Sequence, residues 1–142
     1  MNKIKKTILY IGGFELPDRN AAAQRVVAVG KLFRELGYNV VFIGIDKYLS
    51  DNSKIETTKT KYFGFDSWAV SYPKSSINWL KYIGSIYDLE FLIKRYYKND
   101  LFALVFYNHP FLIQYRLRKS KKRWGFLLFL MLLNGIVDVA EE

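Results

Sequence analysis

Two groups of residues in this 142-residue chain have the types and spacing to support binding or catalysis. Gly12 and Gly13 follow an apolar run, where glycine lets backbone N–H groups approach a ligand closely. His109 is the only histidine; it stands between Asn108 and a proline and is suited to general base catalysis or to hydrogen bonding with a sugar or phosphate. Both patterns also occur in ordinary turns, so a ligand-binding and a structural interpretation stay open for each.

Charged and polar side chains near predicted helix and strand ends add further candidates. Arg25 falls in the first two turns of a predicted helix, where a cation opposes the helix dipole by roughly a few tenths of a kcal/mol. An anionic ligand would remove that conflict, and the alternative is an arginine that simply reaches solvent. Asn20 is a suitable N-cap for the same helix, and Asp46, at the end of a predicted strand, is suited to hold a ribose hydroxyl.

Known catalytic motifs are missing from the sequence. It has no cysteine, no metal-ligand spacing, no nucleophile elbow and no P-loop. The G-x-G-x-x-G fingerprint is also absent, which disfavours a domain that binds nicotinamide or flavin dinucleotides. We therefore expect neither a metal nor a cofactor.

These candidates are positioned by an alternation of buried strands and amphipathic helices. Apolar, β-branched runs predict strands at 7–13, 39–46 and 101–108, and three- to four-residue periodicity predicts helices at 20–37 and 77–98. Pro110 suits the first turn of a further helix, and the polar stretch 47–76 contains short strands or an extended excursion. The pattern predicts an α/β fold, a Rossmann-like doubly wound parallel sheet, with ligands beyond the carboxyl ends of its strands.

The net charge of +9 favours acidic partners, namely nucleic acid, an anionic membrane surface or phosphorylated substrates. The densest basic run, residues 116–123, is either the solvated end of a helix or a membrane contact. The first apolar run is too short for a signal peptide and predicts a strand, and the lack of cysteine fits a reducing compartment. We expect a cytoplasmic location, with the option of peripheral association at the inner face of the membrane, and no binding of nucleic acid.

The first third of the chain resembles a known enzyme family. The Gly12-Gly13 turn, the helix start "NAAAQRV" and the segment "ELGYNVVFIG" are similar to the amino-terminal domain of bacterial family-4 glycosyltransferases, which have the two-domain GT-B fold. The later segment "LFALVFYNHP" looks like that family's strand and loop, so the resemblance covers about residues 5–120. It implies that the chain is one half of a GT-B architecture.

The resemblance also implies a function. In this family the amino-terminal half binds a sugar or lipid-linked acceptor, and the carboxy-terminal half binds the nucleotide-sugar and carries the catalytic glutamates. The resemblance therefore implies the acceptor-binding half of a retaining glycosyltransferase, inactive alone, that makes surface polysaccharide or glycolipid. The candidate acceptor-binding residues are Gly12, Gly13, Asn20, Arg25, Asn108 and His109.

Residues 124–142 form an apolar tail beside the expected domain, residues 1–123. The uncharged run 124–133 is too short to span a bilayer, which needs about 20 residues. Three interpretations stay open: a leucine-rich buried strand, a membrane-surface segment, and the product of a frameshift near codons 120–127. One choice of codons for residues 128–136 encodes Ile-Ser-Asp-Val-Thr-Glu-Trp-Tyr when reading starts two nucleotides later. This second sequence looks like that of the family. We therefore expect a truncated chain with an out-of-frame tail.

Two other functions remain as alternatives. The chain could be an intact, non-catalytic subunit that pairs with a separately encoded donor domain. It could also be a small protein that associates with the membrane surface through the basic and apolar residues 116–142.

Overall fold

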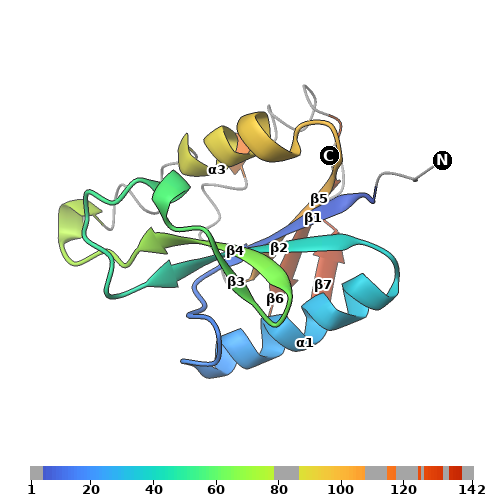
Figure 1. The fold of residues 1–142 in the computed structure, drawn as a ribbon, viewed down its shortest axis with the longest axis horizontal. Coiled ribbons are helices and arrows are strands. Elements are labelled where there is room, and N and C mark those ends of the chain that lie inside the picture. The colour runs from blue at the N-terminus through green and yellow to red at the C-terminus, as the bar shows by residue number, and fades with distance from the viewer. Residues whose placement is uncertain are drawn as a thin grey trace.

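A computed structural model describes residues 5–78, 87–107, 115–117, 125, 127–132 and 135–138. Its centre is a seven-stranded sheet in the order β3-β4-β2-β1-β5-β6-β7 (Figure 1). The five inner strands are parallel, and the two outer strands, β3 and β7, are antiparallel to their neighbours. The predicted α/β fold with a mostly parallel sheet is confirmed.

The first βαβ unit follows the sequence pattern closely. Strand β1 spans Thr7–Gly12, helix α1 spans Ala21–Glu35 and strand β2 spans Asn39–Asp46. Asn20 caps α1 as predicted, because its side-chain oxygen accepts a hydrogen bond of 2.8 Å from the backbone N–H of Ala23. All six residues of β1 are buried, which is typical of a strand that is covered on both faces.

The polar stretch after β2 supplies two strands to the sheet. A short 3₁₀ turn at Ile55–Thr57 precedes β3, Thr60–Tyr62, and β4, Phe65–Ser71. β3 and β4 form an antiparallel hairpin, and β4 pairs in parallel with β2 from Val41 to Asp46. Of the two predicted forms, short strands rather than an excursion are therefore found.

The later helices lie within the described residues only in part. Helix α3 spans Tyr87–Leu92 and continues as one π-helical turn, Ile93–Tyr97, inside the helix predicted at 77–98. Strand β5 follows at Leu101–Tyr107, as predicted. Most of the helix predicted after Pro110 lies outside the described residues.

Helices cover both faces of the sheet, α1 on one side and α3 on the other (Figure 1). Strand residues alternate between the two cores because successive side chains point to opposite faces. Tyr10 and Phe42 pack with α1, whereas Leu9 and Val41 pack with α3. The chain thus buries two apolar layers around one sheet.

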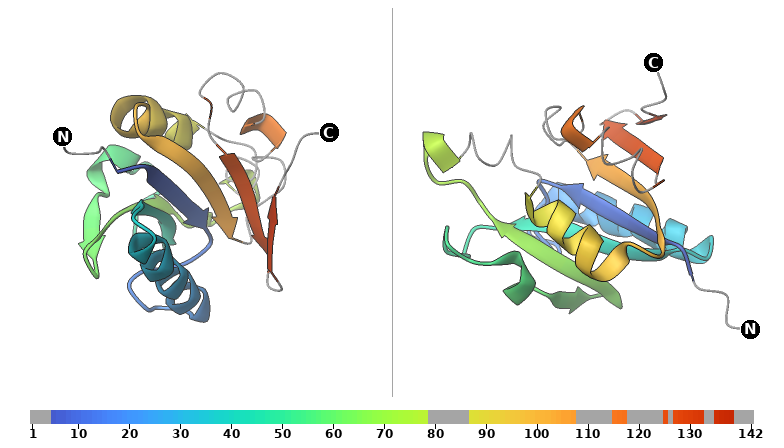
Figure 2. Two further views of the ribbon diagram at one scale, coloured as in Figure 1. Left: turned by 90° about the vertical axis from the view of Figure 1, so that its right-hand side faces the viewer. Right: turned by 90° about the horizontal axis from the view of Figure 1, so that it is seen from above.

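The tail adds the last two strands. β6, Leu127–Leu132, pairs in parallel with β5, and β7, Gly135–Asp138, turns back antiparallel to β6. Figure 2 shows both strands extending the sheet beyond β5. The described backbone of the tail is thus in strands. The three interpretations of the tail, including the frameshift, stay predictions. Among the helices that the structure describes, none is long and apolar enough to cross a membrane.

The amino-terminal edge of the sheet is tied together by polar side chains. The Thr7 hydroxyl donates a hydrogen bond to the carboxylate of Asp100, and the amide nitrogen of Asn39 donates to the Thr7 hydroxyl at 3.0 Å. These residues lie at or just before the starts of β1, β5 and β2. The polar side chains at this end of the strands therefore bond to one another. The candidate site lies at the opposite edge, where the parallel strands have their carboxyl ends.

Candidate ligand site at the carboxyl edge of the sheet

The parallel strands end at one edge of the sheet, where β2 and β4 point to the left in Figure 1. Gly12, the last residue of β1, stands opposite Tyr107, the last residue of β5. Asp46 at the end of β2 stands opposite Ser71 at the end of β4. In open parallel sheets, ligands bind beyond this edge.

The two glycines of the predicted site have different surroundings. Gly12 is buried, and a Cβ atom added there would lie 2.3 Å from the backbone oxygen of Tyr107. Gly13 is exposed, and an added Cβ atom would meet no atom within 4 Å. Gly12 therefore permits close packing of β1 against β5, and only Gly13 faces open space at the edge.

The loop from Gly13 to Asn20 is fastened to the end of β2. The backbone N–H of Ile45 donates a hydrogen bond of 3.0 Å to the carbonyl oxygen of Phe14. An added Cβ atom at Gly44 would lie 2.5 Å from the same oxygen, so glycine is needed for this close approach. The loop is thus held at a fixed position beside the strand exits.

Two ion pairs reinforce this attachment. Lys47 Nζ lies 3.2 Å from Glu15 Oε2, and Arg19 Nη1 lies 3.4 Å from Asp46 Oδ1. Asp46 Oδ1 also accepts a hydrogen bond of 2.8 Å from the backbone N–H of Tyr48. The Asp46 carboxylate therefore already has two partners in the protein, Arg19 and the Tyr48 N–H. A ribose hydroxyl would have to share the carboxylate with them.

Among the described residues at this edge, Glu15 is the most deeply buried charged one, at 5% exposure. A carboxylate loses hydration when it is buried, and the ammonium group of Lys47 compensates part of that loss. Buried charged groups close to the strand exits often belong to functional sites, although structural ion pairs have the same appearance. Glu15 thus joins Gly13 as a candidate that could meet a ligand hydroxyl.

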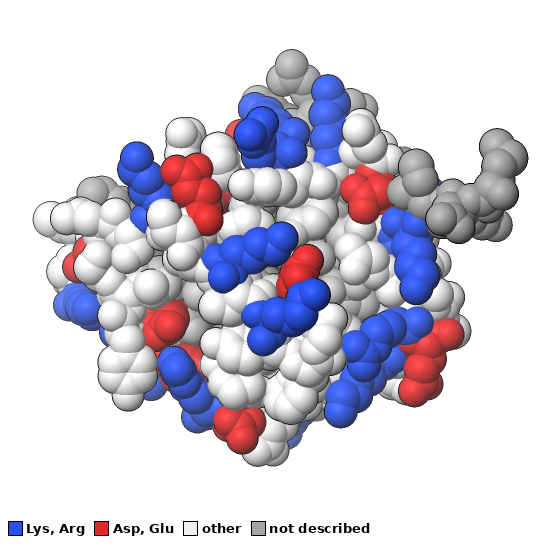
Figure 3. Space-filling model, viewed as in Figure 1, with Lys and Arg blue, Asp and Glu red and all other residues white. Residues whose placement is uncertain are grey.

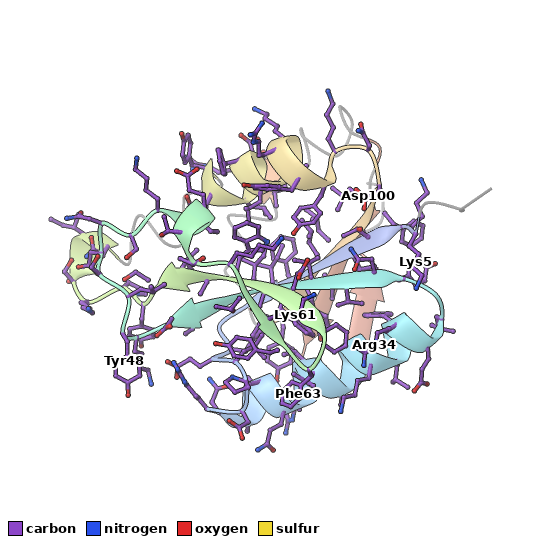
Figure 4. All side chains as sticks on the ribbon, viewed as in Figure 1. Lys5, Arg34, Tyr48, Lys61, Phe63 and Asp100 are labelled. Atoms are coloured by element: carbon purple, nitrogen blue, oxygen red, sulfur yellow. The ribbon has the colours of Figure 1, made fainter. Side chains whose placement is uncertain are left out.

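Aromatic rings flank the ion pairs. Tyr48 is 85% exposed, and the guanidinium carbon of Arg19 lies 5.3 Å from the centre of its ring. Lys47 Nζ lies 5.9 Å from the centre of the Tyr72 ring. Figure 4 shows Tyr48 pointing away from the body of the molecule. Rings together with charged groups offer a polar, ring-shaped ligand both flat contacts and hydrogen bonds.

Of the remaining predicted site residues, two are described by the structure and two are not. The side-chain oxygen of Asn20 is used in capping α1. Arg25 is exposed, and none of the ion pairs between described residues involves it. The first turn of α1 has no acidic residue either, so nothing described on the helix offsets the conflict between Arg25 and the helix dipole. Asn108 and His109 lie outside the described residues.

Tyr10 lies in the core below this edge and is fully buried. Burial, and secondarily the neighbouring Tyr107, raises the pKa of Tyr10 well above its ordinary value. The Tyr10 hydroxyl is therefore neutral at physiological pH and is unsuited to act as a base. No group of three or more His, Cys, Asp or Glu side chains that could hold a metal ion is found in the part of the chain that the structure describes.

Sequence reasoning missed Glu15, Arg19 and Lys47. Each stands in a segment directly after a predicted strand, so the carboxyl-edge rule alone could have marked them. Their pairing could not be predicted, because it depends on how the loop folds across β2.

Comparison with models of protein families, with curated proteins and with solved structures finds no match for this chain. The resemblance to family-4 glycosyltransferases therefore depends on the sequence motifs alone.

Proposed function

We propose that the chain is the acceptor-binding half of a retaining, GT-B-type glycosyltransferase that builds a surface polysaccharide or glycolipid from a nucleotide-sugar. The nucleotide-sugar would be bound by a different, carboxy-terminal domain. Alone, the chain would bind the sugar or lipid-linked acceptor without transferring sugar to it. We place it in the cytoplasm, peripherally at the inner face of the membrane.

The order of the inner strands, β4-β2-β1-β5-β6, is the observation that carries this proposal. The chain proceeds from β1 to β2 and β4 on one side, and β5 and β6 follow on the other side. The same order of neighbouring strands occurs in Rossmann-like sheets, where the ligand crevice lies at the point of reversal, and this supports the proposal. Gly12, Gly13 and the loop that follows them lie at this point, and the sequence motifs that resemble the family include the same residues.

The local chemistry supports a polyol ligand. Gly13 leaves open space, Glu15 and Asp46 supply acceptors, and Arg19 and Lys47 supply donors, at the loop after β1 and the end of β2. A sugar presents several hydroxyls, each of which both donates and accepts hydrogen bonds. The site therefore has the groups needed to orient a saccharide, whereas a catalytic role for any of them is not part of the proposal.

The proposal is tested by titrating isotope-labelled protein with saccharide fragments of surface polysaccharides and, separately, with nucleotide-sugars. We expect the backbone amide signals of Gly13 and Glu15 to shift with a saccharide and to stay unchanged with a nucleotide-sugar. Gly13→Ala should weaken saccharide binding because it fills the open space, and Asn99→Ala, at the opposite edge of the sheet, is the matched control. Binding of nucleotide-sugars alone, or saccharide shifts that avoid this edge, would refute the proposal.

The coding DNA separates the two forms of the proposal. If another frame encodes Ile-Ser-Asp-Val-Thr-Glu-Trp-Tyr and continues into a domain with paired glutamates, the chain is the truncated half of one enzyme. If no such frame exists, a pull-down with the tagged chain should recover a separate subunit that carries the donor domain.

A further inference from the structure

The turn that joins β3 to β4 carries an aromatic ring at an unusual place. Phe63 is 53% exposed and has a φ of 50°, and the next residue, Gly64, has a φ of 79°. Tight hairpin turns with positive φ favour asparagine, aspartate or glycine, because other residues lose about 1–2 kcal/mol in this region. A bulky apolar residue is thus found where neither burial nor backbone preference favours it.

Basic side chains of α1 and of the hairpin lie near this turn, and that of Lys31 contacts the ring. Lys31 Nζ on α1 lies 5.7 Å from the centre of the Phe63 ring, and Arg34 Nη1 donates a hydrogen bond of 3.0 Å to the Phe63 carbonyl oxygen. Lys59 and Lys61 lie just before and within β3, which forms the edge of the sheet. We call these five residues the hairpin patch.

The patch carries an excess of positive charge. Among the ion pairs between described residues, those of the patch involve one carboxylate, Asp66, which Lys59 and Lys61 share at 3.7 and 3.8 Å. Glu35 follows at the margin, at the end of α1. Figure 3 shows lysine and arginine side chains across this side of the molecule, and Figure 4 labels Lys61, Arg34 and Phe63 near the β3–β4 hairpin.

Arg34 attaches the patch to the hydrophobic core. The guanidinium carbon of Arg34 lies 4.1 Å from the centre of the Phe65 ring, and Phe65 is buried in the core under α1. Arg34 therefore joins the helix to the hairpin through a stacked ring and a backbone hydrogen bond. In contrast, the side chains of Lys31, Lys61 and Phe63 are exposed and contribute little to the packing of helix and hairpin.

We propose that the hairpin patch docks the protein on an anionic lipid bilayer. The Phe63 ring would enter the interfacial layer while Lys31 and Lys61 meet lipid phosphates. Aromatic rings partition well into that layer, and each basic residue near an anionic membrane surface adds to the attraction. A single exposed ring offers little area for a folded protein partner, which would need a much larger apolar surface.

This inference rests on the proposed function only for the location at the membrane. It involves neither the glycine pair nor the ion pairs of the carboxyl edge. Vesicle binding without saccharide binding would therefore refute the proposed function alone, and the reverse result would refute docking alone.

The test is co-sedimentation of the full chain with phosphatidylcholine vesicles that contain or lack phosphatidylglycerol. We expect binding only to the anionic vesicles, and weaker binding as salt is raised. The double variant Lys31→Gln/Lys61→Gln should reduce partitioning about thirtyfold, since each lysine near the surface contributes about fivefold. Phe63→Asn should reduce it about tenfold by removing the ring while keeping a residue suited to the turn.

Matched controls separate docking by the patch from general attraction. Lys5→Gln/Lys98→Gln removes the same charge from exposed sites outside the patch, and Tyr48→Asn removes an exposed ring elsewhere. Each control should keep more of the binding than the corresponding patch variant. Equal losses in patch and control variants, equal binding to neutral vesicles, or release by soluble glycerol phosphate would each overturn the proposal.

Discussion

The backbone oxygen of Tyr107 would lie 2.3 Å from a Cβ atom at Gly12, which is closer than non-bonded atoms approach. Because Tyr107 is part of β5, relief of this contact would require the two central strands to separate. The last residue of β1 thus has to be glycine for the sheet to close at the place where the strand order reverses. Its neighbour Gly13 has no such constraint.

Gly12→Ala should therefore destabilise the protein by about 2 kcal/mol or more, as is usual for overpacking against a rigid neighbour. Gly13→Ala should change the free energy of unfolding by less than about 0.5 kcal/mol, because the methyl group meets nothing. Urea denaturation followed by circular dichroism measures both. Equal stabilities for the two variants would contradict the assignment of a packing role to Gly12 and of an open position to Gly13.

The ion pair of Glu15 and Lys47 makes a second prediction. Lys47→Gln should destabilise the chain by about 1–2 kcal/mol, because it leaves the buried carboxylate without its cation. Adding Glu15→Gln should recover part of that loss, since no buried charge then remains uncompensated. Thermal unfolding of the wild type, both single variants and the double variant gives the coupling energy, with Lys74→Gln as an exposed control. Additive effects would show that the pair does not hold the loop.

Much of the scaffold could be predicted because it follows from hydrophobic periodicity. The runs that became β1, β2 and β5 are apolar except at the ends of β1 and β2, as is typical of strands buried on both faces, and the side chain of Asn20 caps α1. Strand β4 was harder to assign because its sequence, FDSWAVS, mixes polar and apolar residues. Its polar residues are tolerated because β4 lies next to the outer strand β3. That position depends on tertiary contacts, which the local sequence does not reveal.

The candidate site could be predicted less well. The carboxyl-edge rule located the glycine pair correctly, but it could not separate the packing role of Gly12 from the open position of Gly13. That difference depends on the approach of β5, which is far away in the sequence. The pairing of Glu15 with Lys47 could not be predicted for a similar reason. It depends on the loop conformation that brings the residue after β2 to a residue in the loop after β1.

Tyr97 links the π-helical turn to the sheet and predicts a pH dependence. Its hydroxyl oxygen accepts a hydrogen bond of 2.9 Å from Trp68 Nε1, and burial raises the pKa of Tyr97 from 10.0 to about 12. The folded state holds this proton more tightly than the unfolded state, so stability is fully present below pH 10 and falls as pH rises toward 12. Burial of Tyr10 acts in the same direction.

Tyr97→Phe should have two measurable effects. At neutral pH it should cost about 1–2 kcal/mol, because the buried Trp68 N–H loses its acceptor. Above pH 10 the variant should lose stability less steeply than the wild type, with a residual slope due to Tyr10. Urea denaturation at several pH values checks both effects, and Tyr48→Phe, an exposed tyrosine, should follow the wild type throughout. Parallel curves for wild type and Tyr97→Phe would refute the role of Tyr97.

Phe63 leads to the last prediction, which concerns stability at the β3–β4 turn. Phe63→Asn should stabilise the protein by about 0.5–1 kcal/mol, because asparagine tolerates a φ of 50° better than phenylalanine. The lost contact with Lys31 offsets only part of this gain, since an exposed cation–π contact contributes about 0.5 kcal/mol. Phe63→Ala removes the same ring without relieving the backbone and should not be stabilising.

Urea denaturation of the two variants therefore distinguishes a residue kept for folding from one kept for contact with a surface. If Phe63 serves the fold, both substitutions destabilise the chain. If it serves membrane docking, Phe63→Asn yields a more stable protein that binds anionic vesicles about tenfold more weakly, because the cost of the left-handed backbone is retained only in exchange for the exposed ring.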